Sequence, residues 1–318
     1  MHLIDQILCR HPDPNEVTDT QTILADNVYH YYMVDNPKDK WSVTDFPNLA
    51  PPFENFFVEG AMPSMINNNG NLIPRPAHLR GVRTGVHFVA MEFESPEQIE
   101  YTRHYFKQIG YQKALPIESA KWCLRLTPYA GDGKTISHAP GHVCLFIDDQ
   151  GAVIPLDPPA NESYTMYILD PKYNHLSETD AQKLLHDMNE SSPMMIYPAL
   201  LTISFMHCKN VYMERQRPPA ALSKKHERRH GKPLCTWRTL TIEPMKKILR
   251  TEGKSESVGL PRSLHICHGH FKDYTKGKGL FGKHHGNYWW PWRVQGDPET
   301  GVSGKDYKVI APITTKAK

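Results

Sequence analysis

The residue types best suited to chemistry are concentrated in one segment, residues 264–296. Alternate side chains of an extended strand point to the same side, so His268, His270 and Lys272 are expected to share one face. Cations and aromatic rings follow, namely Lys276, Lys278, Lys283, His284, His285, Tyr288, Trp289, Trp290, Trp292 and Arg293. Imidazoles, ammonium groups and aromatic rings in one place are typical of surfaces that contact nucleic acid.

Three kinds of site are compatible with this segment. In the first, the lysines and Arg293 pair with phosphates, and exposed rings stack on unpaired bases. In the second, His270 or His268 also acts as a general acid or base, while Lys272 stabilises charge on a cleaved phosphodiester, as in a metal-independent ribonuclease. The third is a zinc site, with ligands drawn from His265, Cys267, His268, His270, His284 and His285.

The zinc interpretation is the weakest in its spacing, because the segment lacks the paired C-x₂-C and H-x₃-H patterns of structural zinc sites. We therefore expect no metal and no other cofactor. A plainer alternative also stays open for the whole segment. In it, the aromatic residues form the core of a sheet and the histidines make ordinary hydrogen bonds.

The distribution of charge along the chain supports a polyanionic partner. Residues 1–208 contain 14 Lys and Arg against 25 Asp and Glu, a net charge of −11, whereas residues 209–318 contain 23 against 9, a net charge of +14. A basic surface is the usual electrostatic footprint of phosphate binding, so RNA or DNA is the expected partner. The alternative is that the acidic part packs against the basic part.

A second group of cations lies in the stretch 221–233, which the sequence predicts to be a basic linker or an exposed helix. Such a run can follow a phosphate backbone, although many charge runs are simply solvated. Together with the C-terminal segment, the predicted nucleic-acid-binding residues are Lys224, Lys225, Arg228, Arg229, Lys272, Lys276, Lys278, Lys283, Tyr288, Trp290 and Arg293.

The elements that position these groups follow from periodicity and turn residues. Helices are predicted over 18–34, 96–110, 177–190 and 193–217, and strands over 86–93, 123–127, 141–156 (a hairpin), 164–169, 235–242, 264–274, 287–294 and 306–310. The predicted fold class is α+β, with an acidic N-terminal antiparallel sheet and helices, then a long helix and a basic C-terminal antiparallel meander. The predicted divisions are 1–175, 176–222 and 223–318, unless the chain forms one continuous domain.

Other features exclude several classes of protein. The six cysteines are spread along the chain with no CxxC pair, which argues against a disulfide-stapled secreted domain. The N-terminus lacks the pattern of a signal peptide, and no run approaches the ~18 apolar residues of a spanning helix. We expect a soluble cytoplasmic protein without a membrane partner. The stretch 131–135 resembles the end of a P-loop, but Pro128 replaces its first glycine, so we expect a hairpin turn there.

The string H-x-C-x-G-H-F-K-x-Y, from His265 to Tyr274, is followed by Leu280-Phe281-Gly282 and by Tyr288-Trp289-Trp290. This pattern resembles a group of uncharacterised phage and actinobacterial mobile-element proteins, as do Asp45-Phe46-Pro47 and Ala50-Pro51-Pro52-Phe53. His268 departs from the pattern, which favours arginine there, and this shifts any catalytic role towards His270. The resemblance implies a source and not a function.

The sequence therefore predicts a phage or mobile-element protein that binds nucleic acid and acts on a host process, with ribonuclease-like cleavage as its enzymatic version. The rival hypothesis is a protein-interaction inhibitor of a host defence or polymerase. In that case the acidic N-terminal region would be the working surface and a host protein would be the partner.

Overall fold

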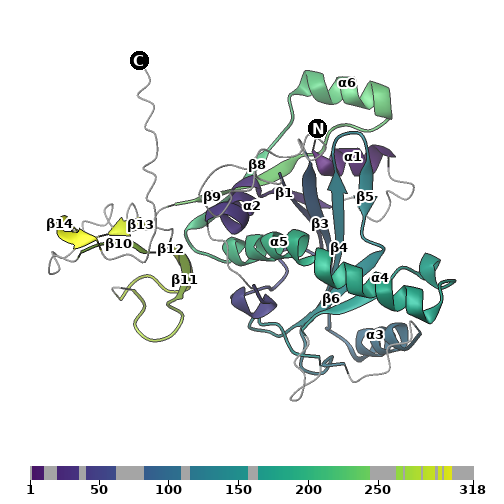
Figure 1. Cartoon of the computed structure of the whole chain (residues 1–318), viewed down its shortest axis with the longest axis horizontal. Coiled ribbons are helices and arrows are strands. Elements are labelled where there is room, and N and C mark those ends of the chain that lie inside the picture. The colour runs from purple at the N-terminus through teal and green to yellow at the C-terminus, as the bar shows by residue number, and fades with distance from the viewer. Residues whose placement is uncertain are drawn as a thin grey trace. The chain divides into compact units, whose positions relative to one another are not determined.

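The computed structural model describes residues 2–10, 20–35, 41–61, 82–108, 115–156, 164–243, 263–267, 269–280, 282–290, 293–295 and 297–302. The chain forms two compact units (Figure 1). The first contains Met1–Pro63 and Arg75–Ile242, and the second contains Ser64–Pro74 and Glu243–Lys318. The α+β class is confirmed. The second of the two units contains the chain from Glu243 onwards, and the divisions predicted at 175 and 222 stay predictions.

The first unit is built on a nine-stranded sheet in the order β7-β6-β4-β3-β2-β1-β9-β8, with β5 paired to β4. Its strands are β1 (Gln21–Leu24), β2 (Asn55–Ala61), β3 (Arg83–Glu92), β4 (Trp122–Gly131), β5 (Ile136–His138), β6 (Gly141–Ile147), β7 (Met166–Leu169), β8 (Val211–Gln216) and β9 (Trp237–Ile242). β1 runs parallel to both of its neighbours, and the other pairs are antiparallel, so the sheet is mixed.

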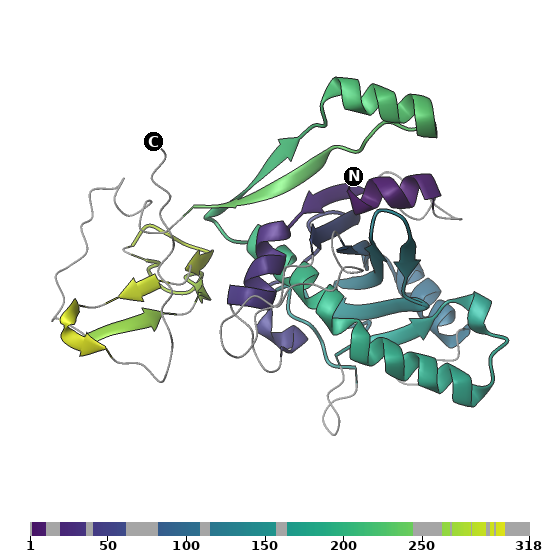
Figure 2. The ribbon, with the colours of Figure 1, turned by 45° about the horizontal axis from the view of Figure 1, so that its top comes forward.

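Helices cover both faces of this sheet. The described helices of the unit are α1 (Leu3–Arg10), α2 (Asp26–His30), α3 (Pro96–Gln108), α4 (Glu178–Ser191), α5 (Pro193–Met206) and α6 (Ala220–His230), of which α6 lies at the end of the β8–β9 hairpin and covers neither face (Figure 2); short helical turns lie at Tyr31–Asp35, Val43–Asp45 and Pro171–Tyr173. The face against α2 and α5 is apolar throughout its centre, where Phe56 stacks on Phe88 with ring centroids 4.5 Å apart. Burial of this face supplies the main hydrophobic stabilisation of the unit.

The opposite face carries two separate apolar clusters. One lies under α1 and contains Leu3, Ile4, Ile7, Phe57 and Tyr129. The other lies under α3 and contains Phe106, Ile117, Cys123, Cys144, Phe146, Leu156, Met166 and Ile168. Strand register places polar residues between the two clusters, because β3, β4 and β6 each carry a charged or imidazole side chain on this face.

Several predicted elements are confirmed. α3 and α4 occupy the expected ranges, and Ser177 caps α4 by accepting a hydrogen bond from the Asp180 backbone at 3.2 Å. The stretch 131–135 is the turn of the β4–β5 hairpin, where Asp132 donates its N–H to the Thr135 carbonyl. No helix within the described part of the chain has the length and apolarity needed to cross a bilayer.

Two helix predictions are wrong over part of their length. Residues 21–24 form a strand, because the run Thr22-Ile23-Leu24 is buried between two neighbouring strands and under both layers. The predicted long helix ends at Met206, and β8 follows it. No glycine or proline marks this change, and pairing with β9 satisfies the backbone of β8 instead of helical hydrogen bonds.

The regular elements in the described part of the second unit are all short strands: β10 (Ser263–Cys267), β11 (His270–Asp273), β12 (Asn287–Trp290), β13 (Arg293–Gln295) and β14 (Asp297–Val302). β11 pairs antiparallel with β12, and β10 pairs antiparallel with β13 and parallel with β14. The predicted strands 264–274 and 287–294 are thus each divided in two. The strand predicted over 306–310 lies outside the described residues.

Candidate nucleic-acid interface

The most basic element of the first unit is an arm made of β8, α6 and β9, which we define as residues 209–242. It carries nine Lys and Arg against two Glu, a net charge of +7. β9 pairs with β1 and β8 is the edge strand of the sheet; Figure 2 shows β8 and β9 as a two-stranded ribbon with α6 at one end. The helix is therefore presented on a support of paired strands and is not a loose linker.

One side of α6 is a cationic face, which we define as Lys224, Lys225, Arg228 and Arg229. The spacing of these residues follows the helical repeat, since 224 and 228, and 225 and 229, are four residues apart. At 3.6 residues per turn the four side chains span an arc of about 140°. All four are exposed. The helix thus directs four positive charges into solvent from one side.

The other side of α6 is docked on its surroundings. The Leu234 backbone donates to Ser223 Oγ at 3.1 Å, and His226 Nδ1 lies 2.8 Å from the Lys232 carbonyl oxygen. His226 Nε2 lies 3.6 Å from Cys9 Sγ on α1. Gly231 ends the helix in the left-handed conformation, with φ of 76°, which favours glycine. These contacts determine which side of the helix faces solvent.

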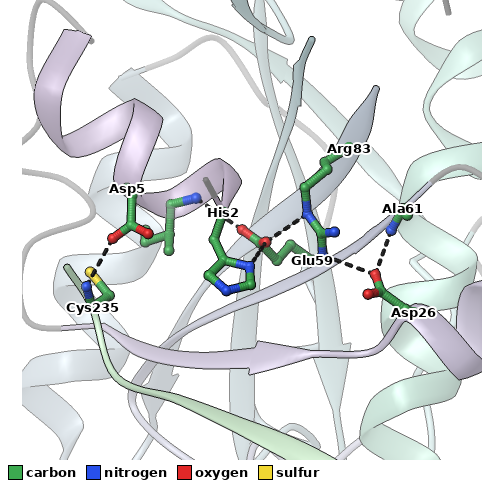
Figure 3. A network of polar contacts seen from close by, with 8 residues as sticks. His2, Asp5, Asp26, Glu59, Ala61, Arg83 and Cys235 are labelled. Atoms are coloured by element: carbon green, nitrogen blue, oxygen red, sulfur yellow. Dashed lines mark hydrogen bonds and ion pairs between the residues drawn. The ribbon is translucent and has the colours of Figure 1, made fainter. Parts of the chain in front are cut away.

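The α6 end of the arm is attached to α1 through Asp5 and Cys235. The Cys235 backbone donates to Asp5 Oδ1 at 2.8 Å, and the Cys235 thiol faces the same carboxyl group (Figure 3). Burial raises the pKa of Asp5 above its ordinary value and raises the pKa of Cys235 to about 12. This thiol is therefore held in its protonated form, and its role here is structural.

A second polar contact set, next to the first, attaches α1 and α2 to the sheet. Glu59 is 0% exposed and accepts hydrogen bonds from Arg83 Nε at 2.8 Å and from the Ile4 backbone at 2.9 Å. Arg83 also pairs with Asp26 at 2.9 Å, and His2 Nδ1 lies 3.3 Å from Glu59 (Figure 3). A buried carboxylate is tolerated here because a cation and a backbone donor both face it.

The ribbon below α6 is polar and partly aromatic. Tyr212 and Met213 are exposed on β8, the last strand of the sheet. Arg215 on β8 is exposed and pairs in register with Arg238 on β9. Arg238 is held within the unit, because its guanidinium hydrogen-bonds Gln21 and lies 5.0 Å from the ring centroid of Phe53. Arg215 therefore extends the exposed positive charge of α6 along β8.

The second unit brings together part of the predicted C-terminal site. The β11–β12 register pairs His270 with Trp290 and Lys272 with Tyr288, so these four residues share a face. His270 and Lys272 are exposed, and Lys272 Nζ lies 4.9 Å from the ring centroid of Trp290. The expected alternation of His270 and Lys272 is confirmed. The ring of Trp290 faces a cation of its own chain.

Tyr288 has a different environment from the one a stacking platform requires. It is 6% exposed, and its ring contacts those of Tyr274 and His284 at 5.9 and 6.0 Å. Trp289 is also buried and packs on Phe271, with ring centroids 4.7 Å apart. The two rings lie on opposite faces of the hairpin, and each is buried against other rings, so neither has an open face for a base.

The remaining predicted residues fall into two groups. Lys276, Lys278, Lys283 and His285 are exposed in the loop between β11 and β12, and His284 is half-buried there. His268 lies outside the described residues, and only the backbone is described for His265, Cys267 and Arg293. Among the side chains that are described, no three His, Cys, Asp or Glu gather as metal ligands would.

Residue patterning within the sheet held a signal that the sequence reasoning missed. His87, Arg125 and His142 each lie between apolar neighbours within a strand. A lone charged or imidazole residue on the inner face of a strand is unfavourable unless it has a partner. Three such residues in adjacent strands would have indicated a shared polar site.

Comparison with known proteins adds no family: no family model, curated protein or solved structure matches this chain.

Proposed function

We propose that this protein binds nucleic acid by its phosphates, with the cationic face of α6 as the principal contact. The observation that carries the proposal is the arrangement of the helix: four cations face solvent while the opposite side is docked through Ser223 and His226. A charged segment that is merely solvated does not require contacts that fix which side of the helix faces solvent. Cations held in a fixed array are the usual means of neutralising phosphates.

The composition of α6 favours contact with the backbone over the reading of bases. Its sequence, AALSKKHERRH, contains no Phe, Tyr or Trp for stacking and no Asn or Gln for bidentate contact with adenine. Lysine and arginine positions one turn apart are about 6 Å from each other along the helix axis, so neighbouring phosphates can be contacted together. Binding is therefore proposed to depend little on sequence.

The lysines of the β11–β12 loop are a second proposed contact. Lys276, Lys278 and Lys283 are exposed beside Lys272, and only Asp273 opposes them among residues 269–290. They belong to the second unit, whereas α6 belongs to the first. Two basic surfaces on one chain bind the same polyanion more tightly than either alone, provided that both can reach it.

The test is the salt dependence of binding, measured by fluorescence anisotropy with labelled single-stranded RNA, single-stranded DNA and duplex DNA. The decisive variant replaces Lys224, Lys225, Arg228 and Arg229 with Gln, a good helix former that preserves α6. Each lost phosphate contact lowers the slope of log K against log salt by about 0.7 to 0.9. The fourfold variant should therefore lower the slope by about 3, so that between about 50 and 200 mM salt the wild-type affinity falls about 60-fold more than that of the variant.

Two exposed lysines outside the arm provide the control, Lys107→Gln on α3 and Lys183→Gln on α4. This double variant should bind like the wild type. Replacing Lys272, Lys276, Lys278 and Lys283 with Gln then measures the share of the second unit. Absence of binding by the wild type at about 50 mM salt, where screening is weakest, would refute the proposal. Equal slopes for the wild type and the α6 variant would refute the role of α6.

A further inference from the structure

Between the two apolar clusters on the α1 and α3 face lies a polar band, which we define as Asn55, His87, Arg125, Thr127 and His142. These residues come from β2, β3, β4 and β6, which are adjacent in the sheet. The register pairs His87 with Thr127 and pairs Arg125 with both Val89 and Cys144. Because directly paired residues share a face, the side chains of the band lie on one side of the sheet.

The band is buried, and its nitrogens are poorly satisfied. His87 is 1% exposed, and its Nε2 lies 2.7 Å from Asn55 Oδ1. His142 is 6% exposed. Within the described part of the chain no hydrogen-bond partner faces His87 Nδ1, His142 Nε2 or Arg125 Nε. Buried polar atoms in folded proteins nearly always have a partner, so three on one patch are suited to hold a ligand or ordered water.

The charge of the band determines the sign of that ligand. The positive charge of the Arg125 guanidinium acts on both imidazoles, which disfavours a metal cation and favours an anion. Asp170, beyond the end of β7, is the carboxylate that acts on His142, and it is paired with Lys172 at 3.1 Å. Neutral His142 can donate one N–H, and Arg125 Nε always carries a proton. The single N–H of neutral His87 is on Nε2, which faces Asn55 Oδ1, so His87 Nδ1 is an acceptor.

The band also reaches solvent at one end. Arg125, Val89 and Asn55 are half-buried, whereas His87 and His142 lie deeper. Tyr105 from α3 lies near enough to Arg125 for the two to interact electrostatically. A small ligand that enters beside Arg125 would therefore meet the imidazoles behind it.

We propose that His87, Arg125 and His142 form a binding site for a small tetrahedral oxyanion, either free phosphate or the phosphate group of a small nucleotide. Arg125 Nε and the His142 ring can donate to phosphate oxygens, and His87 Nδ1 can accept from a P–O–H group, which a carboxylate lacks. The site is separate from the cationic face of α6, and it stands whether or not α6 binds nucleic acid.

In the experiment, the full chain is titrated with inorganic phosphate at pH 7 and constant ionic strength. Binding is measured by calorimetry and by NMR of ¹⁵N-labelled histidine rings. The protein used is the α6 fourfold Gln variant, so that phosphate bound by α6 does not contribute. One phosphate should bind per chain, and the ring signals of His87 and His142 should shift. Adenosine monophosphate is the second probe. Tighter binding than that of phosphate identifies a nucleotide source, and equal or weaker binding identifies free phosphate.

Arg125→Gln should weaken phosphate binding at least about tenfold, which is the loss expected for one charge-assisted contact. His142→Phe should also weaken it, and this variant is expected to fold because an apolar ring replaces a buried, unsatisfied one. Lys107→Gln, an exposed change on α3, is the control and should leave binding unchanged. Thermal melting of each variant checks that it is folded.

Three results would overturn the proposal. The first is no saturable binding of phosphate or adenosine monophosphate up to about 10 mM. The second is binding that survives both Arg125→Gln and His142→Phe in folded protein. The third is tighter binding of acetate than of phosphate, which would exclude a tetrahedral oxyanion. A crystal structure grown in phosphate that shows only ordered water on the three nitrogens would count with the first.

Discussion

Acid should destabilise the first unit at a pH well above that at which its carboxylates become protonated, because two histidines are buried in neutral form. Burial, with a smaller contribution from Arg125, lowers the pKa of both His87 and His142 to about 4. In the unfolded chain a histidine has a pKa of about 6.5. Between these values the unfolded state binds a proton that the folded state does not, so stability is lost as the pH falls from about 6.5 to about 4.

The size of the effect follows from the same two values. A difference of about 2.5 pKa units corresponds to about 3 kcal/mol for each histidine, at 1.36 kcal/mol per unit. Both side chains are nearly inaccessible to solvent, so screening by water reduces this little. Since domains are stable by about 5–15 kcal/mol, the loss from the two groups together is a large fraction of the total.

The assay is urea unfolding at pH 7.5, 6.5, 5.5 and 4.5. Unfolding is monitored by hydrogen exchange of peptides from β4 and β6, which report on the first unit alone. His142→Phe removes one of the two titrating groups. Its free energy of unfolding should fall less steeply between pH 6 and 4.5, by about 1.4 kcal/mol per pH unit relative to the wild type. His186→Gln, an exposed change on α4, should leave the wild-type slope intact.

Other buried groups titrate nearby, but they do not obscure the comparison. Burial lowers the pKa of His207, which acts in the same direction as His142. The raised pKa of Asp5 acts in the opposite direction, because a carboxyl group whose pKa is higher in the folded state makes the protein less stable as the pH rises. Both are present in the wild type and in the variant, so they cancel in the difference. Identical pH slopes for the wild type and His142→Phe would refute the reasoning.

Two further predictions concern the frame of the first unit. Glu59→Gln should lower its stability by about 2–4 kcal/mol in urea unfolding, because it removes the buried partner of Arg83; a loss below about 0.5 kcal/mol would show that Asp26 alone suffices. Gly141→Ala should cost at least about 2 kcal/mol, since an added Cβ would lie 1.9 Å from the Ile168 carbonyl oxygen in the paired strand. Gly231→Ala, in open space with φ of 76°, should cost only about 1 kcal/mol.

The elements that the sequence predicted well are those with local causes. Ser177 marks the start of α4 because its side chain satisfies a helical N–H, and the stretch 131–135 turns because Asp132 accepts hydrogen bonds from the Lys134 and Thr135 backbones. The prediction for β1 was wrong because a short buried strand has no hydrophobic periodicity that distinguishes it from a helix. The predicted end of α5 was wrong because the helix ends where β8 begins to pair with β9, about 30 residues away in the sequence.

The candidate interface divides in the same way. The basic character of Lys224, Lys225, Arg228 and Arg229, and their fit to a helix, could be read from residue types and spacing. Their shared exposure depends on the contacts of His226 with Cys9 and Lys232, which no local pattern records. For the same reason, the burial of Tyr288 could not be predicted from its position in an aromatic run.

The amino-acid sequence by itself determined the charge of the C-terminal part, the α+β class and most helices with local caps, because these depend on residue types and near neighbours. Only the tertiary structure decided which cations face solvent and which rings are buried. It alone brought His87, Arg125 and His142 onto one patch of the sheet, although the first and last of them are 55 residues apart in sequence. The physical reason is that strand pairing is non-local: register places residues side by side, and nothing in their own segments specifies the neighbour.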